Sequence, residues 1–429
     1  IFDTNIEQEI VELGGKKYRR DPDVFDTWFS SSSWPYATLD YPDSQDFKDF
    51  YPLSVMETGF DILYPWVSRM IMLGLYITDE VPFEKVYLHG LIQDEHGAKM
   101  SKSKGNVINP MLKIDAYGSD AFRMGIIADE SPASSRPYDE SKLVGARNFC
   151  NKLWNIARYI EGVLGDGVKH GQKPEPKTAA DHWVIMQLNE QGGKIGECIA
   201  SYRFSEAYET LYHLVWDDVA DWYIEASKTA QNTSVMNYVL ETILKLAHPF
   251  APFVTETIWQ TLHADDETMV AVAGWPTGAH ADTAKAADFE EIKRIVTEVR
   301  QIKTMLNIQK GTLLIDEQAF VEQYCDVIAK IARLDAVTLG TEGEGLELTS
   351  STKNAKLLVD SAVAKAFAVS LAEKEVSLAR QIGQLEGRLN NESYVQKAPE
   401  HLVSESRDQL AKLQLELTTV KAQITQFKM

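Results

Sequence analysis

The sequence predicts a multidomain chain that combines an α/β region with all-α regions, and three observations point to this fold class. From Asp21 to about Asp129, short apolar runs alternate with glycine, proline and helical stretches, as in α/β domains. From Asp139 onward, apolar residues recur every three or four positions, which is typical of packed helices. From Leu371 onward, apolar residues follow heptad repeats, which predict a coiled coil.

In the α/β region, Gly14–Gly15 predicts the turn of a hairpin, and Val81–Leu88 predicts the approach to a buried strand. The helical region contains an amphipathic helix with a wide apolar face, and a second helix that ends before Pro249 and Pro252. We assign Trp154 and Trp222 to the core of this helical bundle. The apolar face of the first helix consists of Phe204, Ala207, Tyr208, Leu211, Val215, Val219, Trp222 and Tyr223.

A smaller α+β region follows the bundle, with an amphipathic helix around Ile292–Ile302 and strands at Thr312–Ile315 and Ala336–Leu339. Beyond it, two heptad seams are separated by Ala398–Pro399, so we expect an antiparallel coiled-coil hairpin rather than a dimerisation zipper. The seams are Leu371, Leu378, Ile382, Leu385 and Leu389, then Val403, Leu410, Leu413, Leu417, Val420, Ile424 and Phe427. The expected domains are 1–138, 139–279, 280–365 and 366–429.

The composition limits the possible classes of function. With 44% hydrophobic and 25% charged residues, the 429-residue chain is globular, and no apolar run approaches the ~18 residues of a membrane span. A net charge of −20 excludes nucleic-acid binding through general basicity, so any such contact must use local patches. Three scattered cysteines predict neither disulfides nor a cysteine zinc site, which fits a cytoplasmic protein. The start at Ile1, without a signal peptide, suggests a fragment.

The strongest motif is KMSKS at Lys99–Ser103, a string expected by chance in about one chain in ten thousand of this length. Together with Lys104 it places three ammonium groups within six residues, and Gly97 and Gly105 on either side allow the segment to move. Such a loop suits ATP whose α-phosphorus is attacked while pyrophosphate leaves, because positioned lysines offset the charge that builds in the transition state. Ser101 and Ser103 could orient the lysines or donate to phosphate. The alternative is a solvated surface loop.

The segment resembles the second signature of class I aminoacyl-tRNA synthetases, and the surrounding motifs resemble the valyl, isoleucyl and leucyl subgroup, most closely the valyl enzymes. The isoleucyl enzymes usually carry C-terminal zinc cysteines, which this chain does not supply. The motifs are DVFDTWFSS (Asp23–Ser31), ETGFDILYPW (Glu57–Trp66), His89–Gly90, YGSDAFR (Tyr117–Arg123), ARNFCNKLWN (Ala146–Asn155), DWYIE (Asp221–Glu225) and LAHPFAPF (Leu246–Phe253).

One departure from the family pattern is important. The sequence contains no His-x-Gly-His element, the first class I signature, and nothing in it resembles the family's inserted editing domain. The resemblance therefore implies that residues 1–138 are the second half of a Rossmann-like catalytic domain with a stem-contact segment, in a C-terminal portion of a longer enzyme. It implies a helical anticodon-binding domain at 139–279, a junction domain at 280–365 and a tRNA-binding arm at 366–429.

The resemblance also implies roles for individual residues. Lys99, Lys102, Ser101 and Ser103 would be catalytic, and Trp28, Ile62 and Trp66 would line the amino-acid pocket, although residues of these types taken alone more often belong to a hydrophobic core. Ile62 and Trp66 are four apart, which on a helix places them on one face. Lys102, Gly59, Asp61, His89 and Gly90 would bind ATP. Asp61 could instead start a helix, His89 could be structural, and Asn106 could cap the following turn.

Arg147, Lys152 and Arg158 form a basic stripe without an acid, and Lys152, Asn155 and Tyr159 lie at helical spacing. This face suits unstacked RNA bases, with stacking on Tyr159, although a solvated helix face would look similar. The whole resemblance implies a valine–tRNA ligase that uses ATP with Mg²⁺, valine and tRNA(Val), binds no metal through the protein, and is monomeric when full-length. An isoleucine- or leucine-specific relative and a non-catalytic tRNA-binding protein remain alternatives.

Overall fold

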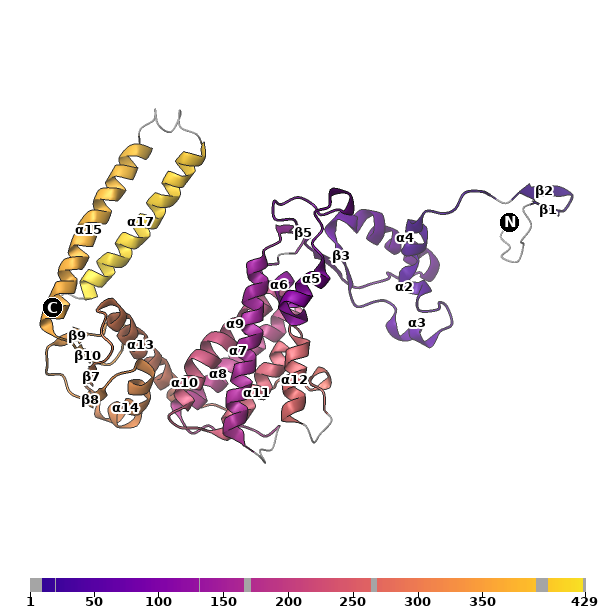
Figure 1. The fold of residues 1–429 in the computed structure, drawn as a ribbon. Helices are drawn as coiled ribbons and strands as arrows, with labels where there is room; N and C mark the ends of the chain where they lie inside the picture. The colour runs from indigo at the N-terminus through magenta and orange to yellow at the C-terminus, as the bar shows by residue number, and fades with distance from the viewer. Residues whose placement is uncertain are drawn as a thin grey trace. The chain divides into compact units, whose positions relative to one another are not determined.

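The computed structural model describes residues 10–19, 21–130, 132–165, 171–263, 268–390 and 400–426. The chain is mostly helical with several small sheets (Figure 1). It divides into two compact units, one formed by 1–147 with 198–208 and the other by 148–197 with 209–429. The four domains expected from the sequence remain a finer division that these two units neither match nor test.

The first unit alternates short strands and helices, as the α/β prediction requires. Its hairpin turns at Gly14 and Gly15, whose φ angles of 60° and 75° suit a two-residue turn. The elements are β1 (Ile10–Leu13), β2 (Lys16–Arg19), α1 (Thr27–Ser32), α2 (Trp34–Ala37), α3 (Gln45–Phe50), β3 (Met56–Gly59), α4 (Ser68–Thr78), β4 (Val86–His89), β5 (Ile92–Gln93), α5 (Pro110–Tyr117), α6 (Ser119–Ile127) and β6 (Arg136–Pro137).

A parallel pair of strands is the centre of this unit. β3 pairs with β4 so that Glu57 lies opposite Tyr87 and Gly59 opposite His89. Successive side chains point to opposite faces, so Glu57, Gly59, Tyr87 and His89 share one face. Met56, on the other face, packs in a buried core with Val67, Met70 and Phe83.

The segment between β3 and α4 is not the regular helix that the spacing of Ile62 and Trp66 predicts. Phe60–Ile62 forms a 3₁₀ turn and Leu63–Val67 forms a π-helical turn. Pro65 explains this, because it has no N–H to donate to a preceding carbonyl and its ring crowds the turn before it. The outer side of α4 is exposed, including Met72 at 68% and Tyr76 at 82%.

The region from Asp139 onward is mostly helical, as predicted. The second predicted helix ends at Ala247, and Pro252 begins the next one. The first predicted helix changes character at Leu214, where ten residues adopt π-helical geometry up to Tyr223, a change that periodicity alone does not reveal. The helices are α7 (Glu140–Leu164), α8 (Ala179–Ala200), α9 (Phe204–His213), α10 (Ile224–Ser227), α11 (Thr233–Ala247) and α12 (Pro252–Leu262), and Val270–Val272 forms a 3₁₀ turn.

The small α+β region follows as predicted. Its mixed sheet has the order β8-β7-β10-β9, and α14 connects the parallel strands β7 and β8. The elements are α13 (Thr283–Met305), β7 (Thr312–Ile315), α14 (Gln318–Ala332), β8 (Ala336–Leu339), β9 (Gly345–Glu347) and β10 (Ala355–Leu358).

Two long helices, α15 (Ser361–Leu389) and α17 (Glu400–Gln426), lie side by side (Figure 1). Leu371, Leu378, Ile382 and Val420 of the predicted seams are buried between them. Lys374 pairs with Glu416 at 2.8 Å across the helices. Phe427, the last seam residue, and the break at Ala398–Pro399 lie outside the described residues.

Two buried carboxylates of α13 hold the loop that precedes β10. Glu291 and Glu298 are seven residues apart, so they lie on the same side of the helix. Glu298 accepts hydrogen bonds from the backbone N–H groups of Thr349 at 2.7 Å and Ser350 at 2.8 Å, and Glu291 accepts one from Thr352 at 2.7 Å. Each carboxylate thus satisfies loop donors that would otherwise be left without a partner.

This loop predicts a pH-dependent stability. Burial raises the pKa of Glu291, but hydrogen bonds from Ser351, Arg294 and Thr352 outweigh it and lower the pKa from 4.5 to about 2. Because the folded pKa is the lower one, the contribution is complete above pH 4.5 and is lost as the pH falls toward 2. We expect Glu291→Gln to lower the free energy of unfolding by about 3 kcal/mol at pH 7 in urea titrations, and by progressively less below pH 4.5.

The control is Glu342→Gln, which removes an exposed acid from the same region. It should leave the stability nearly unchanged at every pH. A loss for Glu291→Gln that is constant with pH would contradict the role of its charge.

Candidate functional site

The lysine loop lies at the carboxyl end of β3. Lys99 Nζ is 2.9 Å from Asp61 Oδ2, which joins the KMSKS segment to the 3₁₀ turn that follows β3. The hydrogen bond from Lys99 lowers the pKa of Asp61. The Lys99 side chain is 69% exposed, so solvent reaches this ion pair and a competing anion could replace Asp61 as the partner of Lys99.

The rest of the loop is a short, open turn. Lys102–Lys104 forms a single 3₁₀ turn that ends at Gly105, whose φ of 68° is the left-handed conformation that glycine adopts easily. The hydroxyls of Ser101 and Ser103 are 3.2 Å apart, so the two predicted catalytic serines contact each other. The side chains of Lys102 and Lys104 are exposed.

Asn106 was a candidate cap for the turn that follows it, but it does not have this role. Asn109 caps α5, accepting a hydrogen bond from the N–H of Met111. The side chain of Asn106 instead reaches back into the lysine loop, where it contacts Asp94 and Ser101. Asp94 is a functional candidate that the sequence analysis missed, and its position three residues before Gly97 was the available signal.

The remaining predicted ATP residues lie at the ends of the central strands. His89 Nε2 is 3.3 Å from Glu57 Oε1, and its Nδ1 is 2.7 Å from the carbonyl oxygen of Gly90. A Cβ at Gly59 would come within 2.9 Å of Asp61 Oδ1. A Cβ at Gly90 would overlap the carbonyl oxygen of Ser134, so close packing of the backbone alone explains that glycine.

A cavity of about 470 Å³ opens beside His89 and Gly90, on the face of the sheet that carries Glu57 and Tyr87. Burial, together with the charge of Glu130, raises the pKa of Tyr87 to about 12, so its hydroxyl stays protonated at neutral pH. Two predicted ATP residues, His89 and Gly90, line this largely apolar cavity together with Tyr87, but Gly59 and Asp61 do not line it.

The predicted amino-acid pocket is brought together in part. α1 packs against the π-helical turn, and the indole N–H of Trp66 donates to the carbonyl oxygen of Ser31 at 3.4 Å. Trp28, from the same short helix α1, lies beneath the guanidinium of Arg69 at 5.9 Å. Trp28, Ile62 and Trp66 are each partly buried. The structure thus places the two indole-bearing segments side by side.

The expected RNA-contacting residues of α7 have mixed environments. Lys152 pairs with Asp221 at 2.8 Å and lies over the ring of Trp216, so the basic stripe does meet an acid, which comes from the π-helical segment. Asn155 and Arg158 are exposed. The hydroxyl of Tyr159 is buried and has no hydrogen-bond partner within the described residues. Arg147, in the first unit, lies over the ring of Tyr117 at 5.6 Å.

Trp154 is not in the core, contrary to the sequence-based expectation, because its side chain is 42% exposed. Leu153, Ile156 and Ile160 take the inward positions of α7, which turns Trp154 toward solvent. Trp222 is partly buried between Lys293 and Arg300, each 5.6 Å from its ring. Trp154, like Asn155 and Arg158, is therefore exposed on α7, and it adds an aromatic ring to this surface.

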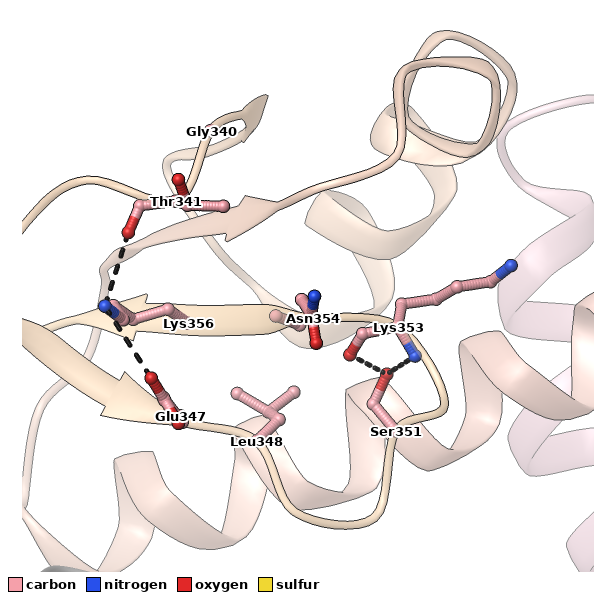
Figure 2. A pocket seen from close by; sticks show the side chains of 9 residues that line it. Gly340, Thr341, Glu347, Leu348, Ser351, Lys353, Asn354 and Lys356 are labelled. Carbon is pink, nitrogen blue, oxygen red and sulfur yellow. Dashed lines mark hydrogen bonds and ion pairs between the residues drawn. The ribbon is translucent and has the colours of Figure 1, made fainter.

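Another cavity, of about 330 Å³, lies in the small α+β region (Figure 2). Lys356 Nζ is 3.3 Å from the carbonyl oxygen of Thr341 and 3.9 Å from Glu347. Ser351 makes hydrogen bonds at 3.0 Å to the backbone N–H and carbonyl of Lys353. The side chains of Lys356 and Ser351 thus bind other groups of the cavity lining.

Within the described residues, no group of three or more His, Cys, Asp or Glu side chains could hold a metal ion. No helix in the same part of the chain is long and apolar enough to cross a membrane.

Three family models match this chain. A model of class I tRNA synthetases (I, L, M and V) matches residues 2–136, a model of the anticodon-binding domain of tRNA ligases matches 181–318, and a model of the valyl tRNA synthetase tRNA binding arm matches 372–428. The first match contains the lysine loop, and the third corresponds to α15 and α17.

Several curated proteins that are similar to this chain are named valine–tRNA ligase. The valine–tRNA ligase of Streptomyces avermitilis is 35% identical over 96% of this chain and 48% of its own length. The valine–tRNA ligase of Bacillus subtilis is 34% identical over 92% of the chain and 48% of its own length. That of Mycolicibacterium paratuberculosis is 33% identical over 99% of the chain and 51% of its own length. The chain thus spans about half the length of these relatives.

Among solved structures, LeuRS of Agrobacterium radiobacter K84, in a ternary complex with tRNA and LeuAMS, has a TM-score of 0.56 and 21% identity. The match covers 65% of this chain and 36% of that one, and it supports the class I tRNA synthetase fold. The three family models and the valine–tRNA ligase relatives show that the chain belongs to the valyl-tRNA synthetase family of class I tRNA synthetases.

Proposed function

We propose that this chain supplies the lysine loop, part of the amino-acid pocket and the tRNA-binding regions of a cytoplasmic, monomeric valine–tRNA ligase. In the complete reaction, a carboxylate oxygen of valine attacks the α-phosphorus of ATP, which enters with Mg²⁺. The bond between the α-phosphorus and the oxygen that joins it to the β-phosphate breaks, and valyl-adenylate and pyrophosphate form. A terminal ribose hydroxyl of tRNA(Val) then attacks the carbonyl carbon and releases AMP.

The observation that carries this proposal is the contact between Lys99 and Asp61. It brings the lysine loop to the end of β3, beside the segment that contains Ile62 and Trp66. An anionic triphosphate at this position would meet the Lys99 and Lys102 ammonium groups near the predicted amino-acid pocket of Trp28, Ile62 and Trp66. The ion pair holds both groups until ATP arrives, when Asp61 can accept from ribose hydroxyls and Lys99 can turn to phosphate.

Ser101 and Ser103 support the lysines in this proposal. Their hydroxyls can donate to phosphate oxygens or orient the ammonium groups. Gly59, His89 and Gly90 shape the ATP side of the site. Trp28, Ile62 and Trp66 form an apolar pocket wall for a small branched side chain. An isoleucine- or leucine-specific relative would need a different pocket volume, which amino-acid competition in the complete enzyme would reveal.

The lysines provide a direct test in the complete enzyme. We expect Lys99→Ala and Lys102→Ala each to reduce valine-dependent ATP–pyrophosphate exchange about 10²-fold, because each removes a cationic donor that acts on transition-state charge. Lys48→Ala, on exposed α3, is the matched control and should change the rate less than about twofold. Equal activity of Lys99→Ala, Lys102→Ala and the control would rule out a catalytic role for the loop.

The 429-residue chain alone should not catalyse the exchange. Its sequence has no His-x-Gly-His element, and its described residues place only two parallel strands, β3 and β4, in the central sheet. Half of the ATP-binding surface is therefore expected from other residues. Valine-dependent exchange by the isolated chain at a rate near that of the complete enzyme would contradict this expectation.

For tRNA, we propose that the exposed side of α7 contacts unstacked bases. The support is the neighbouring exposure of Trp154, Asn155 and Arg158, which offer a stacking surface, an amide and a cation. Lys152 could contribute a phosphate contact if it exchanged Asp221 for RNA, and Arg147 could do so from its own unit. Tyr159, with a buried hydroxyl, has only part of its ring available. The helices α15 and α17 would form a coiled-coil arm along the tRNA.

Fluorescence provides the test of this surface. Trp154→Ala should weaken tRNA(Val) binding by about tenfold, because loss of one stacking contact costs about 1–3 kcal/mol. Trp275→Ala removes a tryptophan of similar exposure, 44% against 42%, and serves as the control. Arg158→Ala should reduce the salt dependence of the affinity by about one phosphate contact. If the affinity of the unmodified chain for tRNA(Val) hardly changes with salt concentration, this surface is not the one that contacts the RNA.

A further inference from the structure

The lysine loop begins in a tight hairpin that depends on Asp94. The backbone N–H of Gly97 donates to the carbonyl of Asp94, and that of Asp94 to the carbonyl of Ala98, both at 2.9 Å. Gly97 has a φ of 78°, as the turn requires. One carboxylate oxygen of Asp94, Oδ1, accepts from the N–H groups of His96 at 3.0 Å and Ala98 at 2.8 Å. The turn therefore uses one oxygen and leaves the other for another partner.

Asn106 binds this second oxygen from the far end of the loop. Its Nδ2 donates to Asp94 Oδ2 at 2.7 Å, and its Oδ1 accepts from the backbone N–H of Ser101 at 2.9 Å. The same Nδ2 lies 3.4 Å from the carbonyl oxygen of Lys99. One amide side chain thus connects both ends of the lysine loop to its middle. We propose that Asp94 and Asn106 are positioning residues. They hold the backbone of Lys99–Ser101 in the conformation from which the catalytic lysines extend.

The loop requires such a device because its other contacts are weak. Three ammonium groups within six residues repel one another, and the glycines at 97 and 105 add backbone freedom. The Lys99–Asp61 pair is exposed and must open when a phosphate replaces Asp61, so it cannot hold the loop throughout a reaction cycle. The contacts between Asp94, Asn106 and Ser101 are partly buried, and they involve no group that we expect the substrate to bind.

These contacts give the base and the tip of the loop different roles. The Asp94–Asn106 pair fixes where the loop starts and returns, and Lys99 remains free to exchange Asp61 for phosphate. The hydrogen bond from Asn106 also lowers the pKa of Asp94, so the carboxylate form that the turn uses is retained at neutral pH. This role rests on the proposed function for its chemical purpose, but the pair itself is testable separately.

Exchanging the two side chains gives a sharp test in this chain. Asp94→Asn places an amide nitrogen opposite the Asn106 amide nitrogen, and Asn106→Asp places two carboxylates together, so each variant alone loses the bond between them. The double variant restores it, because the amide then at position 94 can accept from the turn through its oxygen and donate through its nitrogen to the carboxylate at position 106. That carboxylate can still accept from the N–H of Ser101. Only the long contact to the Lys99 carbonyl is lost.

The measurement is the rate of tryptic cleavage after Lys99, Lys102 and Lys104, together with hydrogen exchange of the peptide that contains Ser101. We expect each single variant to raise both rates about tenfold, and the double variant to return to within about twofold of the unmodified chain. Asp115→Asn, which removes an exposed acid from α5, matches the charge change of Asp94→Asn and should change neither rate. Single variants that match the control, or a double variant as labile as the singles, would overturn the proposal.

The complete enzyme separates this inference from the proposed function. If both hold, each single variant lowers kcat of ATP–pyrophosphate exchange about tenfold with little change in KM for valine, and the double variant restores kcat. A general loss of folding would not be restored by the exchange. If the unmodified enzyme shows no valine-dependent exchange, the proposed function fails, while the cleavage rates in this chain still decide whether the pair holds the loop.

Discussion

The ion pair between Lys99 and Asp61 is the contact on which the functional interpretation depends. The two residues are 38 positions apart, and their side chains meet at 2.9 Å. Without this contact, KMSKS would be one more lysine-rich loop on the surface of an acidic protein. With it, the loop lies at the carboxyl end of a parallel strand, where open α/β sheets commonly bind their ligands.

The surrounding structure serves this placement in successive steps. The core of Met56, Val67, Met70 and Phe83 fixes α4 against β3 and so fixes the turn that carries Asp61. The hairpin at Asp94 then starts the loop in the required direction, and Asn106 returns it. Stability is thus concentrated at the base of the loop, whereas the tip is held by one exposed ion pair that an anion can replace.

Much of the fold was predictable, for identifiable reasons. The strands β7 and β8 matched their predicted bounds because short β-branched and leucine runs between turn residues have few alternatives. The hairpin at Gly14–Gly15 followed from its turn residues. The π-helical geometry at Leu63–Val67 and Leu214–Tyr223 was not predictable, because an apolar spacing of three and four fits several helix types.

The candidate site shows the same limits. The KMSKS string identified the loop, but its spacing could not show that Asp61 is the partner of Lys99 or that Asn106 reaches back to Asp94. On α7, residue type placed Trp154 in the core, but inward positions already filled by Leu153 and Ile156 leave it exposed. Contacts between residues distant in sequence, and the choice of which side of a helix faces inward, required the structure.

The most direct measurement is a crystal structure of the complete enzyme with a non-hydrolysable valyl-adenylate analogue and pyrophosphate. We expect Lys99 and Lys102 Nζ to lie within about 3.2 Å of pyrophosphate oxygens, and the valine side chain to contact both Trp28 and Trp66. A structure in which the lysines remain directed away from the pyrophosphate, or in which the valine side chain lies far from both indoles, would contradict it.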